Sequence, residues 1–291
     1  MKHISLKIFL FLISYSILSS SMAQEINELD NNLVNTQETE ITLGGGINYL
    51  TIKDNVVSKF VYNGLGGIFN IGISHRNEAI KYSFAFNYQA FRPKTQMFKG
   101  FEYQGLLDTA NLVSVNGVKN NEIQSEILEF NTNFLFRVNK NTPSKFQIWA
   151  GMKLLTTGIT KKFLIFDHQN LTEERWTSFH PEVNLEYHLN YKHRFYYNLD
   201  ASLLGFFSRD YQFNQKPFYF DNSDYLVLSK DKGTYGLSKM MVMNSTLGYR
   251  FLITRFLAMN IQYQLIYNRI AVPLETRMVR QQLTTSFSFV F

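Results

Sequence analysis

Two pairs of side chains in this sequence have types and spacing that could do catalytic chemistry. Asp167 and His168 are adjacent, and such a pair can transfer protons when both side chains reach one substrate. Ser178 and His180 lie two residues apart, which puts them on one face if the segment is extended. A serine beside a histidine base is part of a nucleophilic triad, but the sequence indicates neither a third partner nor a strained nucleophile turn. The better interpretation is that Asp167 and His168 lie in a solvated loop. Ser178 and His180 are then ordinary residues of a strand.

Metal and cofactor chemistry has even less support. His180, Glu182 and His188 could be metal ligands, but on a strand they follow one face over a distance too long for a single ion. The run "GGG" at 44–46 precedes no helix and is not a phosphate loop. Its glycines let the first strand bend or admit bulky neighbours. The chain has no cysteine, which excludes disulfides, thiolate metal sites and a thiol nucleophile. We expect no cofactor, no metal and no catalytic residue.

The N-terminal residues have the pattern of a secretory signal. Lys2 and Lys7 precede an apolar run over 8–18, and a small-residue cleavage motif, "SMA", follows. The run is shorter than the ~20 residues of a spanning helix, so we expect residues 1–23 to be removed. Residues 24–39 are acidic and aperiodic and should form a flexible periplasmic segment. The remaining basic residues are scattered and the chain is exported, so nucleic acid is excluded as a partner.

From about residue 40 onward, apolar and polar residues alternate with a period of two, the pattern of β-strands. The alternation predicts ten strands, most of them longer than the mode of about 5–6 residues in soluble sheets. Pro181 lies inside the sixth strand, and we expect it near the outer rim at the strand's start, because proline breaks a strand ladder. The predicted strands are at about 40–50, 62–74, 79–91, 123–138, 145–155, 178–190, 194–207, 236–251, 255–267 and 279–291.

The connections between these strands alternate in length. An even number of strands puts both termini and all the short turns at one end of the sheet, and the long loops at the other. Extra hairpins within the long loops would raise the count to twelve. The long loops are expected at about 51–61, 92–122, 156–177, 208–235 and 268–278.

The two faces of the strands suit two different solvents. One face is crowded with Phe, Tyr, Leu and Ile, whereas the other mixes small residues with charges. A transmembrane barrel needs an apolar belt toward lipid and a polar interior, and it must close because an unpaired strand edge cannot face hydrocarbon. Tyrosines near strand ends on the outer face are typical of interfacial girdles. These are Tyr49, Tyr82, Tyr88, Tyr187, Tyr197, Tyr249, Tyr263 and Tyr267. The charges expected inside are Lys81, Glu129, Arg137, Lys153, Glu182, Glu186, Arg194, Asp200, Arg250 and Arg280.

The chain resembles bacterial outer-membrane β-barrel proteins over residues 40–291. The most specific motif is the closing strand, in which Leu283, Phe287, Phe289 and Phe291 alternate with polar residues. In that class a terminal Phe with alternating apolar residues resembles the signal read by the outer-membrane insertion machinery. The resemblance implies an all-β, transmembrane, antiparallel up-and-down barrel in the outer membrane. It also implies short periplasmic turns, long extracellular loops, a monomer, and membrane lipid and lipopolysaccharide as neighbours.

The inward charges predict how the lumen is filled. A barrel of ~8 strands is filled by its own side chains, and one of 16 or more leaves an aqueous channel, so ten strands imply a narrow lumen. Aligning the hairpins brings Glu129 and Glu182 near Lys153, which predicts that Lys153 is the hub of an internal acid–base network. In the structural interpretation, the acidic and basic side chains of this network neutralise one another inside the lumen. In the functional interpretation, they form a constriction that selects a small solute. The network's expected members are Lys153, Glu129, Glu182, Glu186, Asp200 and Arg194.

The leading functional expectation is a non-catalytic barrel that acts as a structural or surface-binding protein. Its long loops mix Lys, Arg and aromatics, as in "FRPKTQMFKGFEYQ" and "NQKPFYFDNSDYLVLSKDKG", and such residues are common in contact surfaces for an extracellular ligand or protein. The first alternative is a narrow pore or a transport- or secretion-associated barrel. The second is an outer-membrane hydrolase that modifies lipid or peptide.

Overall fold

The computed structural model describes residues 37–55, 61–95, 122–139, 145–165, 168–213, 231–272 and 275–291. The expected signal sequence and residues 24–36 lie outside this part. Among the described residues, no helix is long and apolar enough to cross a membrane. The strands are β1 (Glu38–Asp54), β2 (Val61–Arg76), β3 (Ile80–Phe91), β4 (Lys94–Thr95), β5 (Glu122–Arg137), β6 (Phe146–Ile165), β7 (His168–His188), β8 (His193–Ala201), β9 (Leu204–Phe213), β10 (Asp231–Gly236), β11 (Met240–Thr254), β12 (Leu257–Ile270) and β13 (Thr276–Val290).

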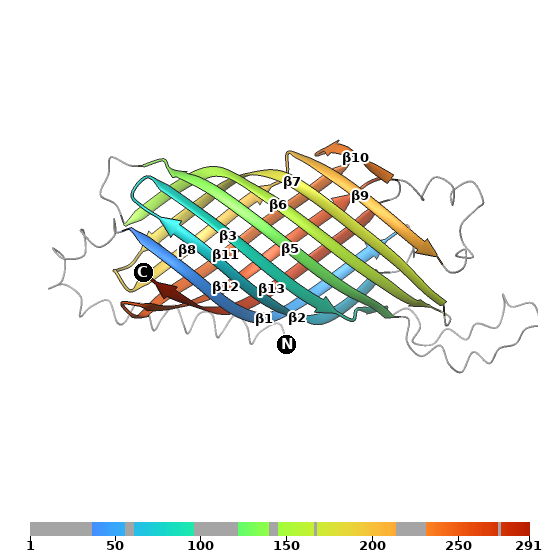
Figure 1. The fold of residues 1–291 in the computed structure, drawn as a ribbon, viewed down its shortest axis with the longest axis horizontal. Helices are drawn as coiled ribbons and strands as arrows, with labels where there is room; N and C mark the ends of the chain where they lie inside the picture. Colours follow the sequence, from blue (N-terminus) through green and yellow to red (C-terminus); the bar gives the residue numbers. More distant parts are fainter. Residues whose placement is uncertain are drawn as a thin grey trace, which may run out of the picture. The chain divides into compact units, whose positions relative to one another are not determined.

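Ten of these strands form a closed ring. The hydrogen-bonded order is β7-β6-β5-β3-β2-β1-β13-β12-β11-β8, and β8 pairs with β7 to complete it. Every pairing in the ring is antiparallel, and the last strand meets the first where Glu40 lies opposite Val290. The predicted ten-stranded antiparallel barrel is confirmed. Of the remaining strands, β4 pairs with β2 and β5, while β9 pairs with the outer part of β7 and β10 pairs with β9. Figure 1 shows the inclined strands, with β9 and β10 at the end opposite to the C-terminus.

The apolar residues of these strands lie on the outside of the barrel. Leu65, Ile47 and Phe289 are 69%, 61% and 54% exposed, whereas Arg280 and Lys161 are fully buried. In a soluble sheet the apolar side chains would be buried and the charges exposed, because burial of a large apolar side chain is favourable and burial of an unpaired charge is not. The reversal is the one a membrane barrel requires. All ten charged residues expected inside are indeed on the inner face.

The two ends of the barrel differ in their connections. We call the end with Phe291 and the short turns the periplasmic end, and the opposite one the outer end. Two asparagines close turns at the periplasmic end. Asn77 Oδ1 accepts backbone N–H bonds from Ala79 and Ile80 at 2.9 and 2.8 Å, and Asn190 Oδ1 accepts them from Lys192 and His193, just before and at the start of β8. An asparagine side chain that mimics a backbone turn in this way explains why these connections are short.

The hairpin of β6 and β7 is much longer than the sequence predicted. The two strands have 20 and 21 residues, and their pairing continues unbroken to Ile165 opposite His168. The loop predicted at 156–177 is therefore wrong, apart from 166–167, which are not described. A spanning strand needs only ~9–11 residues, so the hairpin projects beyond the apolar band. Its outward residues there are largely polar, which removes the alternation that marks a membrane-facing strand.

Pro181 lies in the middle of β7, and the prediction that it starts the strand is wrong. Phe179 pairs with Leu204 of β9, and Glu182 pairs with Asp200 of β8. The register therefore shifts by one residue across Pro181, which is a β-bulge. A bulge is one of the few positions where a strand tolerates a residue without an N–H group. The chain thus leaves β8 and begins β9 directly opposite the proline.

The glycines of β1 allow its close approach to β13. A Cβ atom on Gly46 would lie 2.1 Å from the backbone oxygen of Leu283, and one on Gly44 would lie 2.3 Å from the Cβ of Ser286. Any side chain there would push the closing strand away. The interpretation that these glycines admit neighbours is confirmed, and they permit the seam between first and last strands to close.

Candidate functional site

The inward side chains of opposite strands are arranged in matching layers. From the outer end to the periplasmic end, the inward residues of β7 are first charged, then apolar, and then polar or charged. Over the same distance, those of β13 are polar, then apolar, then charged, and then polar again. The layers therefore extend across the lumen. The residues in order are Glu174, Trp176, Ser178, His180, Glu182, Asn184 and Glu186 on β7, and Thr276, Met278, Arg280, Gln282, Thr284 and Ser286 on β13.

The outermost layer is a fully buried ion network. Lys161 Nζ lies 2.6 Å from Asp54 Oδ2 and 2.7 Å from Glu174 Oε1, and Arg209 reaches the same Glu174 oxygen at 2.8 Å. Thr276 Oγ1 donates to Asp54 at 3.0 Å. A buried charge is tolerated when it is paired and hydrogen-bonded. This layer ties β1, β6, β7, β9 and β13 together at the outer end.

An apolar cluster fills the lumen beneath that network. Trp176 is 1% exposed and Phe207 is 0% exposed. Side chains buried to this extent are closely packed. The buried members of the cluster are Leu50, Phe91, Ile127, Leu155, Ile159, Trp176, Phe207, Met240, Val242, Ile270 and Met278.

A second polar layer adjoins the apolar cluster on the periplasmic side. Arg280 Nη2 lies 2.6 Å from Glu129 Oε1, and Gln89 Nε2 donates to the other Glu129 oxygen at 2.9 Å. Asn48 and Gln282 donate in turn to Gln89 Oε1, at 2.6 and 3.2 Å. Every member is buried, so this layer braces the narrow part of the lumen between β1, β3, β5 and β13.

Asp200 is the hub of a third cluster. Its Oδ2 lies 2.8 Å from Lys153 Nζ, and its Oδ1 lies 2.7 Å from His180 Nδ1. Asn244 Nδ2 donates to the same Oδ1 at 2.7 Å. On the far side of the imidazole, His180 Nε2 lies 2.7 Å from Ser178 Oγ. Four strands (β6, β7, β8 and β11) thus meet at one carboxylate.

The bulge opposite Pro181 explains how these groups come together. Ser178 and His180 share the inner face of β7 because they are two residues apart. Asp200 is paired with Glu182, one inward position further along, and its side chain reaches back to His180. Bulges commonly re-aim side chains beside functional sites.

The order serine, histidine, aspartate is that of a hydrolase triad. A carboxylate can only accept, so His180 donates from Nδ1, and its neutral Nε2 then accepts from the Ser178 hydroxyl. The serine itself is not accessible, because Ser178 and His180 are both 0% exposed. A Cβ atom on Gly205 would lie 3.2 Å from the Ser178 Cβ and 2.8 Å from Met240 Sδ. The arrangement has the hydrogen bonds of a triad but no space for a substrate at the hydroxyl.

The periplasmic end carries the largest set of ion pairs. Glu186 lies 2.9 Å from Arg76 Nη1 and 2.6 Å from Lys81 Nζ. Beside it, Arg250 Nη2 lies 2.8 Å from Glu40 Oε1, and Arg194 lies within 3.5–3.9 Å of Glu38, Glu40 and Glu186. These side chains surround the periplasmic mouth and neutralise one another.

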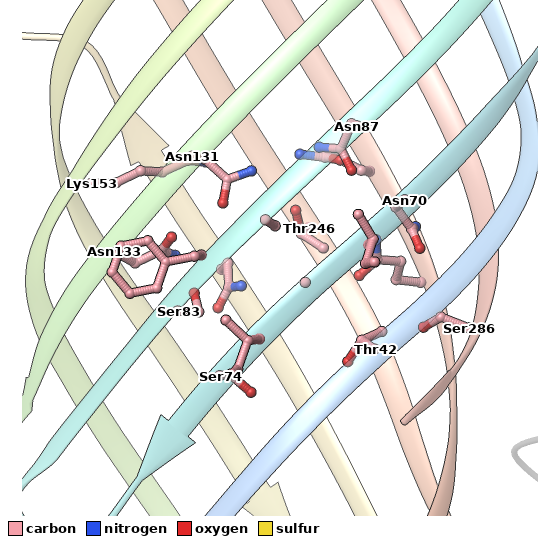
Figure 2. A pocket seen from close by; sticks show the side chains of 18 of the residues that line it. Thr42, Asn70, Ser74, Ser83, Asn87, Asn131, Asn133, Lys153, Thr246 and Ser286 are labelled. Atoms are coloured by element: carbon pink, nitrogen blue, oxygen red, sulfur yellow. The ribbon is translucent and has the colours of Figure 1, made fainter. Parts of the chain in front are cut away.

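A polar cavity of about 220 Å³ lies between the periplasmic ion pairs and the Asp200 cluster. Its wall on β2, β3 and β5 carries small polar residues, and Figure 2 shows Asn131, Asn133 and Lys153 facing Thr42 and Ser286 across the space. Amides and hydroxyls dominate the lining, and Lys153, Glu182 and Asp200 are its charged members. The polar lining comprises Thr42, Asn70, Ser74, Ser83, Asn87, Asn131, Asn133, Asn198, Thr246, Gln262, Gln264, Gln282 and Ser286 with those three.

The structure brings some of the predicted network residues together and separates others. Lys153 meets Asp200 and not Glu129, which pairs with Arg280 instead. Glu129 is not aligned with Lys153, because β5 and β6 pair with Thr157 opposite Glu129, but Glu129 and Glu182 are both close enough to interact with the Lys153 charge. Glu182 is hydrogen-bonded to an amide on β5 rather than to Lys153.

The remaining candidates are distributed over other layers. Glu186 and Arg194 belong to the periplasmic ion pairs, 3.9 Å apart. His188 lies 3.6 Å from Glu186, and no group of three or more acidic, histidine or cysteine side chains among the described residues could hold a metal. Asp167 lies outside the described residues, and of His168 only its place at the start of β7 is described. Phe287, Phe289, Phe291 and Leu283 all face outward on the closing strand or at its end.

Asp200 was the partner that the sequence did not reveal for Ser178 and His180. It was recognised as an inward charge, but its reach to His180 depends on the bulge, which shifts the register by one residue. Pro181 was the only available signal, since a proline inside a strand indicates a bulge.

The closed ring, the exposed apolar band and the buried polar lumen make this chain a bacterial outer-membrane β-barrel protein. Several known structures are similar to this chain. The outer membrane protease OmpT from Escherichia coli has a TM-score of 0.50 and 9% identity, over 88% of this chain and 96% of that chain. The translocator domain of the autotransporter NalP from Neisseria meningitidis has a TM-score of 0.43 and 6% identity, over 95% and 97%. Neisserial surface protein A has a TM-score of 0.33 and 10% identity, over 86% and 96%.

The likeness to OmpT extends to the fold alone at so low an identity. No protein-family model matches the chain, and no curated protein sequence matches it. The class of the protein therefore rests on its architecture, and its role has to be argued from the lumen and the surface.

Proposed function

We propose that this protein is a non-conducting, non-catalytic outer-membrane barrel that acts as a structural or surface-contact protein in monomeric form. One observation carries the proposal: the lumen is filled by the apolar cluster around Trp176 and Phe207, between buried ion networks. Solutes cannot pass a dry, close-packed segment without its rearrangement. The closed part of the interior then serves the barrel's stability, and its contacts with molecules outside the cell are made from its outer surface.

The projecting hairpin of β6 and β7 supports a contact role at the outer end. Its outward side chains there include charged ones: Arg175 and Glu173 form a pair at 3.2 Å, with the Arg175 side chain 75% exposed. Lys162 also faces outward on β6. A rigid wall with exposed charges beyond the apolar band could engage the sugar and phosphate groups of lipopolysaccharide, or an extracellular ligand or protein.

Conductance in planar lipid bilayers tests the proposal. The purified barrel should insert without a steady single-channel current, because the cluster blocks the lumen. A steady current carried by the wild-type protein would overturn the proposal in favour of a narrow pore or transport-associated barrel. Insertion itself is checked by heat-dependent gel mobility of the same vesicles.

Serine hydrolysis is a second candidate function, favoured by the Ser178–His180–Asp200 hydrogen bonds. It requires Met240 and its neighbours to move, so that an acyl carbonyl can reach Ser178 Oγ. A fluorophosphonate probe distinguishes the candidates, since it labels a serine only when a base activates it and the site is open. Labelling that is absent from Ser178→Ala would support hydrolysis, whereas an unlabelled wild-type barrel would support the non-catalytic function.

A further inference from the structure

Glu182 is an exception among the buried carboxylates of the described residues. Glu40, Asp54, Glu129, Glu174, Glu186 and Asp200 each have a Lys or Arg nitrogen within 3 Å. Glu182 is only 2% exposed and has no such ion pair. Its two oxygens accept from a single neutral group, Asn133 Nδ2, at 3.1 and 2.9 Å. A buried carboxylate without a cation is costly, which raises the question of what neutralises it.

The neighbouring cation is already committed elsewhere. Lys153 Nζ is 2.8 Å from Asp200 Oδ2, and the two charges cancel. The three charged residues of the cavity wall are Lys153, Asp200 and Glu182, so with both acids ionised their formal charges sum to −1. One positive charge brought by a ligand would balance them.

The orientation of Asn133 adds a second acceptor. A carboxylate only accepts hydrogen bonds, so the Asn133 atom that faces Glu182 must be its amide nitrogen. Its Oδ1 is then turned away from Glu182 and has no hydrogen-bond partner in the protein. Glu182 and Asn133 both line the cavity. This wall of the cavity therefore carries a carboxylate and, buried beside it, a carbonyl oxygen without a partner, which suits a group with several N–H donors.

The rest of the lining suits a ligand that also carries hydroxyl groups. Amides and hydroxyls from β1, β2, β3, β5, β11, β12 and β13 surround the cavity, and they both donate and accept. A cavity of about 220 Å³ is below the ~300–1,000 Å³ of sites for drug-sized ligands, and it is far larger than a bare monovalent ion. An organic cation of roughly monosaccharide size is smaller than a drug-sized ligand and larger than a bare ion, so it suits the volume of this cavity.

The cavity lies on the periplasmic side of the apolar cluster. On its outer side lie the Glu129–Arg280 pair and the apolar cluster, which are buried throughout. On its periplasmic side, the lining residues Ser74 and Ser83 are each one inward position from Arg76 and Lys81. The Lys81 side chain is 23% exposed, so solvent reaches this edge.

We propose that the cavity binds a small, hydroxylated organic cation from the periplasm, with its protonated amine held by Glu182. The ammonium supplies the missing counter-charge, and the surrounding amides and hydroxyls bind the hydroxyl groups. Lys153 and Asp200 fix the opposite charged wall. This binding does not require the lumen to conduct, and it is independent of the surface role proposed above.

D-glucosamine and D-glucose are a matched probe pair, because they differ in one protonated amine. Equilibrium dialysis of the detergent-solubilised wild-type barrel should show saturable binding of radiolabelled glucosamine and much weaker binding of glucose. Glu182→Gln should weaken glucosamine binding about 10- to 100-fold, the equivalent of one charge-assisted hydrogen bond. Glu182→Asp keeps the charge and should retain part of the affinity. Glu275→Gln, an exposed site outside the cavity, should bind glucosamine as the wild type does.

Three results would overturn the proposal. The wild-type barrel could bind neither probe, which would mean that the cavity holds only water. It could bind both probes equally, which would remove the role of the charge. Glucosamine binding could also be unchanged in Glu182→Gln, which would remove the role of the carboxylate. The comparison of the two probes on the wild type decides the question even if Glu182→Gln does not fold.

Discussion

Lys153 on β6 and Asp200 on β8 form an ion pair of 2.8 Å across β7, the strand that separates them in the sheet. The pair therefore spans a curved part of the inner wall and does not link adjacent strands. Because Asp200 also accepts from His180 and Asn244, the carboxylate makes three hydrogen bonds in a buried setting. Substitution of either Lys153 or Asp200 should therefore disturb the hydrogen bonds of the whole cluster.

Removal of the Asp200 charge should strongly destabilise the barrel. Asp200→Asn breaks the buried ion pair of Lys153, and breaking one partner of a buried pair costs about 3–5 kcal/mol. Lys153→Met should be costly for the same reason, and the double variant should lose less than the sum of the two. The coupling energy should be about 1–3 kcal/mol. Denaturant unfolding in lipid vesicles, followed by the fluorescence of Trp149 and Trp176, measures all four proteins. Strict additivity of the two substitutions would contradict a direct interaction.

The apolar cluster should contribute to stability through its packing inside the lumen. Phe207→Ala removes a ring that is 0% exposed, and the cavity that remains should lower the free energy of unfolding by about 3–5 kcal/mol. Phe206 is its matched control, because it is the preceding residue and faces outward at 52% exposed. Phe206→Ala should cost less, since lipid can fill the space. The same denaturant titration compares them, and an equal loss for both variants would show that the cluster is not tightly packed.

Buried and exposed ion pairs at the two ends should behave differently. Glu186 is 1% exposed between Arg76 and Lys81, so Glu186→Gln should lower the free energy of unfolding by about 3–5 kcal/mol. Glu275 lies outside the strands and is bonded by Arg269 and Arg277. Partly exposed pairs contribute little, so Glu275→Gln should lower the unfolding midpoint only slightly at neutral pH. Equal effects of the two substitutions would contradict the difference in burial.

The Glu275 pair should also respond to pH in a defined direction. Hydrogen bonds from Arg269 and Arg277 hold the pKa of Glu275 below its ordinary value of 4.5. A lowered pKa means that the interaction is fully present above the ordinary value and is lost as the pH falls through the lowered one. Any stability difference between wild type and Glu275→Gln should therefore appear only above that range. A difference that grows as the medium becomes acidic would have the wrong sign.

The class of the fold could be predicted because it depends on local alternation. Long strands with Phe, Leu and Ile on one face, such as Ile80–Phe91, require an apolar solvent on that side and closure at the edges. The projecting part of the β6–β7 hairpin was missed for the same reason. Beyond the apolar band, neither face has to be apolar, so residues such as Thr160 and Lys162 give no period-two signal.

The pairing inside the lumen could be predicted only in part. The apolar–polar alternation shows that Lys153, Glu129 and Glu182 point inward. An error of two residues in the strand register does not change this, because it leaves each side chain on the same face. Which of them meet depends on the register, and the true pairing puts Thr157 opposite Glu129. The link from Asp200 to His180 depends in addition on the one-residue bulge beside Pro181, which no hydrophobic pattern encodes.

Phe291 provides a test of a role that concerns assembly rather than the finished barrel. Its backbone is fixed, with Phe291 N donating to Thr39 O at 2.9 Å, while its side chain is 72% exposed. A side chain that packs against little else contributes little to the folded state. If the insertion machinery reads the terminal aromatic, Phe291→Ala should lower the amount of barrel in the outer membrane severalfold.

Phe256 is the matched control for Phe291, because it is also at the periplasmic end and is 58% exposed. Both substitutions remove one exposed ring, so both should change the unfolding midpoint of the purified, refolded barrel to the same small extent. Only Phe291→Ala should reduce assembly in cells, measured as the heat-modifiable band in outer-membrane fractions. An equal effect on the unfolding midpoint together with a loss of assembly for Phe291→Ala alone would mean that the Phe291 ring is required during insertion and not in the folded barrel. Equal levels of the two variants in the membrane would show that the terminal phenylalanine is not read.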